Sequence, residues 1–379
     1  MGFDIIDTEI LGESHSERMT LNLFGLETGS EFEGDSVLDM LERRKGSRSP
    51  WSTPRLEEDE AVFTGGLKET ERGETKLERG KTYSINGDVV SAYVKNGNVK
   101  KGDYQDILSI PRPSHADYVQ FVRDGKISSG GGRFSGRMTT MLCIAGGIAE
   151  DILRKFGIEV VAYISSIGGK NLGSYRDGAD VKGLDKGRVE LLKSDNFPAL
   201  DEDKKADAIE YIKKVASEGD SVGGTIECVV LGAGAGELGD NLFGGLEGKI
   251  AYSVFGVPAV KGVEFGLGFD LAKTTGSKAN DALVFEDGKV RTATNNNGGI
   301  NGGISNGMPI VLRVAIKPTP SISKEQSSVD LATGENCKLE VKGRHDACIV
   351  PRAVPCVESA VALAVLDELL LAKIAKETL

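Results

Sequence analysis

Helical and strand-like patterns are mixed along this chain without a regular order, and this mixing constrains the fold more than any other feature. Residues 139–156 place apolar side chains at helical spacing before Gly157, whereas residues 309–316 alternate like a half-buried strand. The 379 residues contain no regular βα alternation, no repeat of fixed period and no long Pro/Ser-rich linker. We therefore expect an α+β fold in which residues 1–379 form a single domain.

The same two periodicities locate the other expected elements. Asn-Gly pairs stand before and after the strand expected at residues 89–94, as in tight turns. Further helices are predicted at residues 37–44, 204–216, 242–254 and 357–371, and further strands at residues 158–164, 225–231 and 260–265.

The charge balance limits the kinds of partner. The net charge is −11, whereas nucleic acids and anionic membranes are bound through basic surfaces. The basic residues are nevertheless concentrated locally, and the fifty glycines cluster in runs rather than in a Gly-X-Y period. This combination favours a small anionic ligand held by tight turns, and it disfavours nucleic acid or a membrane as the main partner.

Cysteine usage and the apolar stretches predict a cytoplasmic protein. The five cysteines show no CxxC spacing, so we expect neither a zinc site nor a disulfide framework. No basic region followed by an apolar core stands at the first residues, so no secretory signal is expected. The most apolar stretch, residues 360–375, is interrupted by Asp367, Glu368 and Lys373, which predicts a buried amphipathic helix rather than a membrane span.

The chain has only three histidines, and each lies among small, hydroxyl and charged residues. His15 lies in GESHSE, His115 in PRPSHADY and His345 in GRHD. Histidine is the side chain that most readily exchanges a proton near neutral pH. The arginines and acids beside these histidines favour a site that handles an anion over three satisfied structural histidines.

Three other segments could bind an anion. The run at residues 43–45, continued by Arg48 and Arg55, has guanidinium groups that match phosphate and carboxylate, although a solvated helix end would look the same. GGGRFSGR at residues 130–137 precedes a helix and resembles an anion cradle, but it has neither P-loop nor dinucleotide-fold spacing. NNNGGINGGISNG at residues 295–307 allows positive φ angles near a ligand, and the strand after it leads to KPTPS.

The segment at residues 343–352, GRHDACIVPR, places an acid, a base and cations together before the last helix. An ion-pair network without catalytic function is the competing interpretation of this segment.

Taken in order, these segments resemble the chorismate synthase family from near residue 10 to the end. The family motif GESHG corresponds to residues 12–16, a PRPGHADY-like motif to residues 111–118 and an RSSARE-like motif to residues 133–138; GGISNG, KPT and an RHDP-type motif correspond to residues 302–307, 317–319 and 344–347. Several long motifs in one order are more specific than any single glycine loop. The resemblance implies a β-α-β sandwich, with central helices between antiparallel sheets, and a homotetramer.

The resemblance also implies an activity. The family makes chorismate from 5-enolpyruvylshikimate 3-phosphate by a 1,4-anti elimination of phosphate, the last step of the shikimate pathway, and it requires reduced FMN without net redox change. His15 would then help to protonate the leaving phosphate, and His115 would support the negative charge of the reduced flavin near N1. Asp346 would assist proton removal through flavin N5. The sequence leaves open whether the protein reduces its own FMN with NADPH or depends on an external reductant.

Binding roles follow from the same resemblance, and no metal is implied. FMN contacts would come from Arg133, Phe134, Ser135, Pro258, Ala259, Gly302, Lys317, Pro318, Thr319, Pro320, Ser321 and Arg344, and substrate contacts from Arg44, Arg48, Arg55 and Arg137. Four positions depart from the family pattern, and one of them, Ser16 in place of the last glycine of GESHG, is given no role. Pro258 replaces a frequent Asn, so a flavin contact there would use the backbone, and Met138 replaces a frequent glutamate. Pro50 occupies the place of a family arginine, for which Arg48 is the candidate replacement.

Two other functions remain compatible with these residues. One is a flavin-dependent enzyme with a different reaction on a phosphorylated acid, and the other is a non-catalytic anion-binding or regulatory relative. The chemistry favours chorismate synthase, because a substrate with two carboxylates and a phosphate needs several arginines. The leaving phosphate needs a proton donor, and an electron-rich flavin needs cationic or hydrogen-bonding support.

Overall fold

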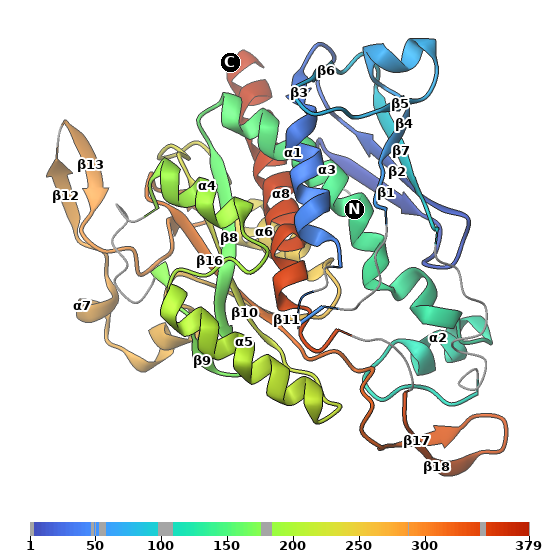
Figure 1. The fold of residues 1–379 in the computed structure, drawn as a ribbon. Coiled ribbons are helices and arrows are strands. Elements are labelled where there is room, and N and C mark those ends of the chain that lie inside the picture. Colours follow the sequence, from blue (N-terminus) through green and yellow to red (C-terminus); the bar gives the residue numbers. More distant parts are fainter. Residues whose placement is uncertain are drawn as a thin grey trace.

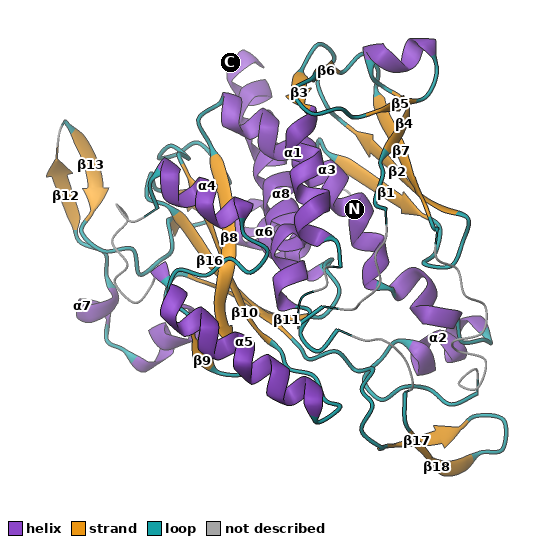
Figure 2. Cartoon of the chain, in the orientation of Figure 1, coloured by secondary structure: helices purple, strands orange, loops and turns teal. Residues whose placement is uncertain are grey.

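A layer of helices lies between two sheets. The structure is a computed structural model that describes residues 4–46, 49, 51–52, 58–97, 109–175, 184–286, 288–341 and 346–378. Within these residues, two five-stranded sheets lie on either side of a bundle of helices (Figure 1). Coloured by secondary structure, one group of helices lies in the centre, with the strands of the two large sheets on either side (Figure 2).

Both sheets pair their strands antiparallel throughout. Sheet 1 has the order β1-β2-β7-β4-β5, formed by Asp7–Leu11, Arg18–Phe24, Val89–Lys95, Val62–Gly65 and Thr75–Lys76. Sheet 2 has the order β11-β16-β10-β8-β9, formed by Val260–Phe265, Ile310–Ile316, Gly224–Leu231, Glu159–Ile167 and Lys170–Asn171. In β16, Leu312 and Val314 join the core beneath the helices, whereas Arg313 points to the other face.

The central layer consists of α1 (Gly34–Arg44), α3 (Thr139–Lys155), α6 (Leu246–Phe255) and α8 (Val350–Thr378). α3 contacts sheet 1 and packs against α1 and α8, while α8 contacts β8 and β10 of sheet 2. The helices α3 and α8 approach closely at Gly146, where a Cβ atom would lie 2.2 Å from Cβ of Ser359. One hydrophobic cluster therefore extends from sheet 1 through the helices to sheet 2.

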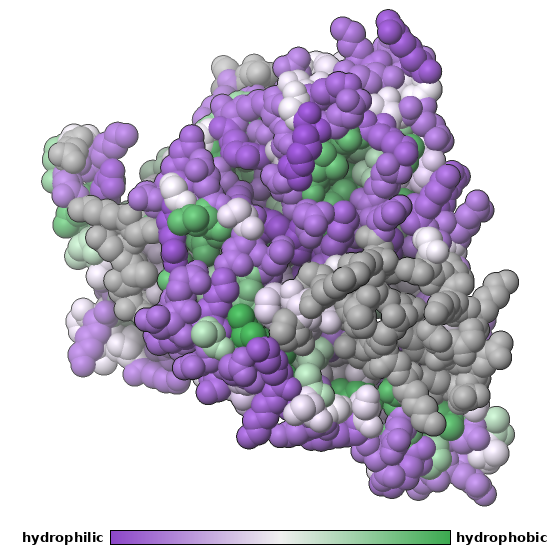
Figure 3. Space-filling view, viewed as in Figure 1, coloured by the Kyte–Doolittle hydropathy of each residue, from purple (hydrophilic) through white to green (hydrophobic). Residues whose placement is uncertain are grey.

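Smaller elements surround this sandwich. The peripheral helices are α2 (Asp117–Asp124), α4 (Lys186–Ser194), α5 (Glu202–Ser217) and α7 (Gly276–Ala279), with short 3₁₀ segments at Lys68–Arg72, Ser129–Phe134, Gly136–Met138, Leu242–Gly244 and Gly268–Lys273. The two-stranded pairs are β3 (Glu31–Glu33) with β6 (Thr82–Ser84), β12 (Leu283–Glu286) with β13 (Lys289–Thr292), β14 (Ile300–Asn301) with β15 (Ile304–Ser305), and β17 (Gln326–Asp330) with β18 (Glu335–Leu339). The β12–β13 hairpin projects from the body and exposes Leu283, Phe285 and Val290. The face of the molecule seen in this orientation is mainly hydrophilic (Figure 3).

Most elements expected from periodicity are present. The strands expected at residues 89–94, 158–164, 225–231, 260–265 and 309–316 correspond to β7, β8, β10, β11 and β16, and the helices expected at 37–44, 139–156 and 204–216 correspond to α1, α3 and α5. The helix expected at residues 242–254 needs a correction, because α6 begins only at Leu246. Gly245 before it is extended (φ −65°, ψ 136°), and Leu242 has a φ angle of 50°.

The last helix is longer than expected. It runs over Val350–Thr378 rather than over residues 357–371, because Pro351 lies in the first turn, where a missing N–H has little cost. Pro355 lies inside the helix, and its carbonyl accepts a hydrogen bond from Oγ of Ser359 at 2.7 Å. Asp367 does not end the helix. Its carboxylate is buried and accepts a hydrogen bond from the backbone N–H of Ile5 at 2.8 Å. No helix in the described ranges is long and apolar enough to span a bilayer.

Candidate active site

Two of the three histidines lie against one glycine turn. His15 follows β1 in the chain and His115 precedes α2. A Cβ atom on Gly130 would lie 2.0 Å from Cε1 of His15, and one on Gly131 would lie 3.2 Å from Cε1 of His115. Both glycines have positive φ angles, 65° and 91°, which other residues rarely adopt. The turn therefore brings together imidazoles from distant segments; His345 lies outside the described residues.

The buried carboxylate of Asp117 orients His115. Nδ1 of His115 lies 2.6 Å from Oδ1 of Asp117, and Arg112 donates to the same carboxylate from Nε at 2.7 Å and from Nη2 at 2.8 Å. Burial alone would raise the pKa of Asp117, but the hydrogen bonds from Arg112 and His115 hold it well below its usual value. We assign the proton of a neutral His115 to Nδ1, because an ionised Asp117 can only accept. Nε2 is then the acceptor nitrogen, on the side of Gly131.

Arg112 and Lys317 connect this turn to the segment expected to hold the flavin. Nη1 of Arg112 donates to Oγ of Ser321 at 3.0 Å, and Nζ of Lys317 donates to the carbonyl of Ser114 at 2.5 Å. The backbone N–H of Lys317 donates to the carbonyl of Ala259 at 3.0 Å. Ser114 and Ala259 have φ angles of 59° and 73°, which are uncommon for residues other than glycine. Three expected binding segments therefore meet at Lys317.

The segment at residues 317–321 has unused polar capacity. Oγ1 of Thr319, which lies between Pro318 and Pro320, is buried and has no hydrogen-bond partner among the described residues. Partial burial and the neighbouring Lys261 lower the pKa of Lys317, and no described carboxylate forms an ion pair with it. A buried hydroxyl and an ammonium group with these surroundings suit an anionic ligand.

Two predicted substrate arginines share one carboxylate. Arg44 at the end of α1 donates from Nη1 to Oδ2 of Asp59 at 2.7 Å, and Nη1 of Arg137 pairs with Oδ1 of the same residue. Exposed fractions are 2% for Arg44, 8% for Arg137 and 3% for Asp59. Arg43 is also buried, in an ion pair with Glu358 of α8. The alternative interpretation as a solvated helix end is therefore wrong for Arg43 and Arg44, whereas Lys45 is partly exposed.

Asp346 joins this arginine cluster through Arg352. Oδ2 of Asp346 lies 2.8 Å from Nη1 of Arg352, whose Nε donates to the carbonyl of Arg44 at 3.1 Å. Both side chains are largely buried. The acid predicted to handle a proton is thus tied to the backbone of a predicted substrate-binding residue, and an ion pair is part of its environment.

Arg133, Phe134 and Ser135 directly follow the glycine turn. Oγ of Ser135 accepts a hydrogen bond from the backbone N–H of Arg137 at 3.2 Å, which links the turn to the arginine cluster. Nη2 of Arg133 pairs with Asp124 at 2.7 Å, and both Arg133 and Phe134 remain partly exposed. Arg48, Arg55 and Arg344 lie outside the described residues.

In a single copy of the chain, Gly302 does not lie beside Lys317. It lies in the turn between β14 and β15, where the N–H of Leu246, the first residue of α6, donates to the carbonyl of Gly303 at 2.9 Å. Pro258 and Ala259 follow the other end of α6, whose 10 residues span about 15 Å. The expected flavin contact of Gly302 is therefore far from Lys317 in one copy of the chain.

Sequence reasoning missed the partners of the expected residues. Asp117 and Arg112 lie inside the 111–118 motif, so their charges could have indicated a support for His115. Arg352 stands in the segment already identified before the last helix. Asp59 had no comparable signal, because it is one acid in the run EEDE and lies in no motif.

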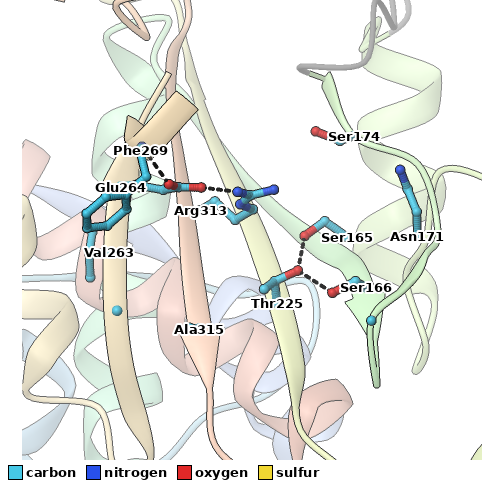
Figure 4. A pocket seen from close by; sticks show the side chains of 12 residues that line it. Ser165, Ser166, Asn171, Ser174, Thr225, Val263, Glu264, Phe269, Arg313 and Ala315 are labelled. Carbon is cyan, nitrogen blue, oxygen red and sulfur yellow. Dashed lines mark hydrogen bonds and ion pairs between the residues drawn. The ribbon is translucent and has the colours of Figure 1, made fainter. Parts of the chain in front are cut away.

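A separate pocket of about 450 Å³ opens on the outer face of sheet 2 (Figure 4). Oγ1 of Thr225 lies 2.7 Å from Oγ of both Ser165 and Ser166, and Glu264 pairs with Arg313 at the opposite wall. No residue expected in the active site is among the described residues that line it. The pocket therefore does not belong to the histidine site.

Comparison with known proteins identifies the family. A family model described as chorismate synthase matches residues 6–370. The chain belongs to the chorismate synthase family. It is 41% identical over 368 residues to a chorismate synthase of Thermococcus gammatolerans, which covers 97% of this chain and 96% of the relative. A chorismate synthase of Archaeoglobus fulgidus is 39% identical over 363 residues, or 95% of this chain and 94% of the relative.

The chorismate synthase fold is shared as well. A solved structure, described as the crystal structure of chorismate synthase, matches with a TM-score of 0.72 and 24% sequence identity over 97% of this chain and 93% of that chain. The expected α+β sandwich of this chorismate synthase family member is therefore confirmed. The expected family and function, a lyase of the chorismate synthase type, are confirmed by the relatives.

Proposed function

We propose that the protein converts 5-enolpyruvylshikimate 3-phosphate into chorismate by a 1,4-anti elimination of phosphate, with reduced FMN bound. The single observation that supports this most is the meeting of His15 and His115 at Gly130 and Gly131. Two proton-handling groups stand at one turn, and the next residues of the chain lead into a buried arginine cluster. An elimination of phosphate from a substrate with two carboxylates and a phosphate needs this combination.

The residues around Lys317 fit the flavin. FMN carries a phosphate. Thr319 has a buried hydroxyl without a described partner, and Lys317, two residues earlier in the chain, has a partly buried ammonium group. These residues, with Ser321 and the backbone of Ala259, would hold the cofactor, and Arg133 and Ser135 would contact it from the glycine turn. When bound, reduced FMN supplies electron density that eases departure of the allylic phosphate.

Arg44 and Arg137 bind and orient the anionic substrate. Both guanidinium groups are buried, so each contact with a carboxylate or phosphate is made where water competes little. Arg48 and Arg55 would add to this charge. Phosphate departure increases the negative charge on the leaving oxygen, and His15 donates a proton to it.

His115 and Asp346 complete the proposed site. His115 is held by Asp117 and supports negative charge on the bound cofactor from its other ring edge. Asp346 takes up the proton lost from the substrate ring, and its ion pair with Arg352 keeps the carboxylate in place. A rate lower by about 10²–10⁴-fold on removal of either group, with binding retained, would support these roles.

Assembly and location are part of the same proposal. The chain forms one folding unit, because a single hydrophobic cluster joins both sheets to the central helices. It works as a cytoplasmic homotetramer, and the exposed apolar side chains of the β12–β13 hairpin suit burial against another copy. The acidic net charge agrees with a small-molecule substrate rather than nucleic acid or membrane as the partner.

The decisive experiment measures phosphate release from 5-enolpyruvylshikimate 3-phosphate with reduced FMN under anaerobic conditions. We expect stoichiometric phosphate and chorismate. Binding of FMN without phosphate release would favour a flavin enzyme with another reaction. Binding of the substrate without any flavin binding or turnover would favour a non-catalytic relative.

A further inference from the structure

Asp59 joins two segments that hold the predicted substrate arginines. It lies in the chain before β4, whereas Arg44 ends α1 and Arg137 precedes α3. The sequence separations are 15 residues from Arg44 and 78 residues from Arg137. Its side chain is fully buried.

Each oxygen of Asp59 binds a different guanidinium group. Oδ2 pairs with Nη1 of Arg44 at 2.7 Å, and Oδ1 pairs with Nη1 of Arg137. Hydrogen bonds to uncharged side chains fix the planes of both guanidinium groups. Nε of Arg44 donates to Oγ1 of Thr139 at 3.3 Å, and Nε of Arg137 donates to Oδ1 of Asn96 at 3.3 Å. One carboxylate therefore sets the distance and the angle between two cations.

The electrostatics make this bridge important. Two buried guanidinium groups repel each other strongly, since little water screens them, and a carboxylate between them offsets this repulsion. Without the carboxylate, the side chains would turn apart toward other acceptors. An anion that requires both arginines at once would then lose its two-point contact.

We propose that Asp59 is a positioning residue that prepares Arg44 and Arg137 for the anionic substrate without touching the substrate itself. This inference rests on the proposed function, because it takes both arginines as substrate ligands. It also predicts an unexpected direction for the change in substrate affinity. Simple charge counting predicts that removal of an acid beside an anion site strengthens anion binding, whereas positioning predicts that binding becomes weaker.

Asp59→Asn tests this sign in the full-length protein. We expect KM for 5-enolpyruvylshikimate 3-phosphate to rise by at least about tenfold, the usual effect of losing alignment of a charge-assisted contact. The Kd for FMN should stay close to that of the wild type, and kcat should change less than KM. A lower or unchanged KM would overturn the proposal, and so would an equal loss of FMN and substrate affinity with a lower Tm.

A second variant and a control complete the test. Asp59→Glu keeps the charge but displaces it, so KM should lie between those of the wild type and Asp59→Asn; this variant decides if Asp59→Asn does not fold. Asp39→Asn removes the acid of another aspartate–arginine pair, the exposed one with Arg79, and should keep the wild-type KM. No phosphate release by the wild type would overturn the proposed function and this inference together. Normal wild-type turnover with an unchanged KM in Asp59→Asn would overturn the Asp59 inference alone.

Discussion

Nδ1 of His115 lies 2.6 Å from Oδ1 of Asp117, so a carboxylate two residues away orients this imidazole. Arg112 contacts both oxygens of that carboxylate and keeps it from rotating. Since Asp117 is held ionised, it stabilises the His115 tautomer with the proton on Nδ1 and leaves Nε2 facing the glycine turn. The role proposed for His115 therefore depends on Asp117.

Asp117→Asn should slow turnover by roughly 10–100-fold, equivalent to about 1.5–3 kcal/mol for a charge-assisted hydrogen bond. An amide can donate as well as accept at Nδ1, so the wrong tautomer of His115 becomes populated. Single-turnover rates and the two Kd values measure the effect, and Asp270→Asn, which alters an exposed pair with Lys273, is the control. An unchanged rate would show that His115 needs no orienting carboxylate.

Gly130→Ala should damage the site almost as much as removal of His15. The new Cβ would lie 2.0 Å from Cε1 of His15, and the φ angle of 65° adds backbone strain, so the imidazole must move. His15→Ala itself should slow turnover by about 10²–10⁴-fold, the range for a positioned proton-transfer group, and His115→Ala should do the same. Gly248→Ala, where a Cβ meets nothing within 4 Å, should keep the wild-type rate. Full activity of Gly130→Ala would mean that His15 has another position during turnover.

Arg44→Ala should weaken substrate binding more than FMN binding. Loss of a buried charge-assisted contact costs roughly 1.5–3 kcal/mol, or about 10–100-fold in affinity. Isothermal titration with each ligand measures both effects, and Arg79→Ala is the control, because that arginine pairs with acids on the exposed side of the same helix. Equal losses for both ligands would contradict a specific role. If Arg48→Ala keeps the substrate affinity, Arg48 does not replace the arginine absent at Pro50.

Local patterns predicted the fold better than they predicted the contacts of the site. The alternation of Ile310, Leu312 and Val314 identified β16, because the period of a half-buried strand is written in consecutive residues. The expected start of α8 at residue 357 was wrong, because the helix begins at Val350 with Pro351 in its first turn, a position that tolerates proline, and continues through Pro355. Packing decides where the helix begins, and sequence periodicity alone does not report this packing.

Long-range partners were beyond such patterns. The family motifs named Arg44 and Arg137, but the carboxylate between them comes from a segment without a motif. The expected flavin contact of Gly302 stays a prediction, because the motif does not show that α6 lies between the Gly302 turn and Ala259, the residue that contacts Lys317 within one copy of the chain. Motifs indicate which residues matter, whereas the distances between them follow from how the helices pack.

Glu150 on α3 should make stability depend on pH. Burial raises its pKa to about 7 from 4.5, and the neighbouring Glu358 adds to the effect despite the ion pair with Lys193 at 2.8 Å. A raised pKa means that its contribution to stability is full below pH 4.5 and is lost as the pH rises through about 7. The free energy of unfolding of Glu150→Gln, measured in urea, should therefore rise relative to that of the wild type as the pH is raised from 5 to 8. Glu190→Gln, an exposed acid, should show no such trend.

Asp346→Asn separates a proton-transfer role from a structural one. The amide keeps the size of the side chain and can still accept a hydrogen bond from Arg352, but it cannot take up a proton. We expect normal affinity for substrate and FMN, and a single-turnover rate about 10²–10⁴-fold lower, the range for a lost general base. Rapid-mixing absorbance under anaerobic conditions measures this rate.

The competing role makes a different pattern. Arg352 also donates to the carbonyl of Arg44, so an Asp346 that merely fixes Arg352 would act on substrate binding and on Tm rather than on rate. Arg352→Lys provides the comparison, since it keeps the charge but cannot make both contacts in the same geometry. If Asp346→Asn matches Arg352→Lys, with a lower Tm, a higher KM and a near-normal rate at saturation, the acid is structural. A large loss of rate in Asp346→Asn alone assigns the proton to Asp346.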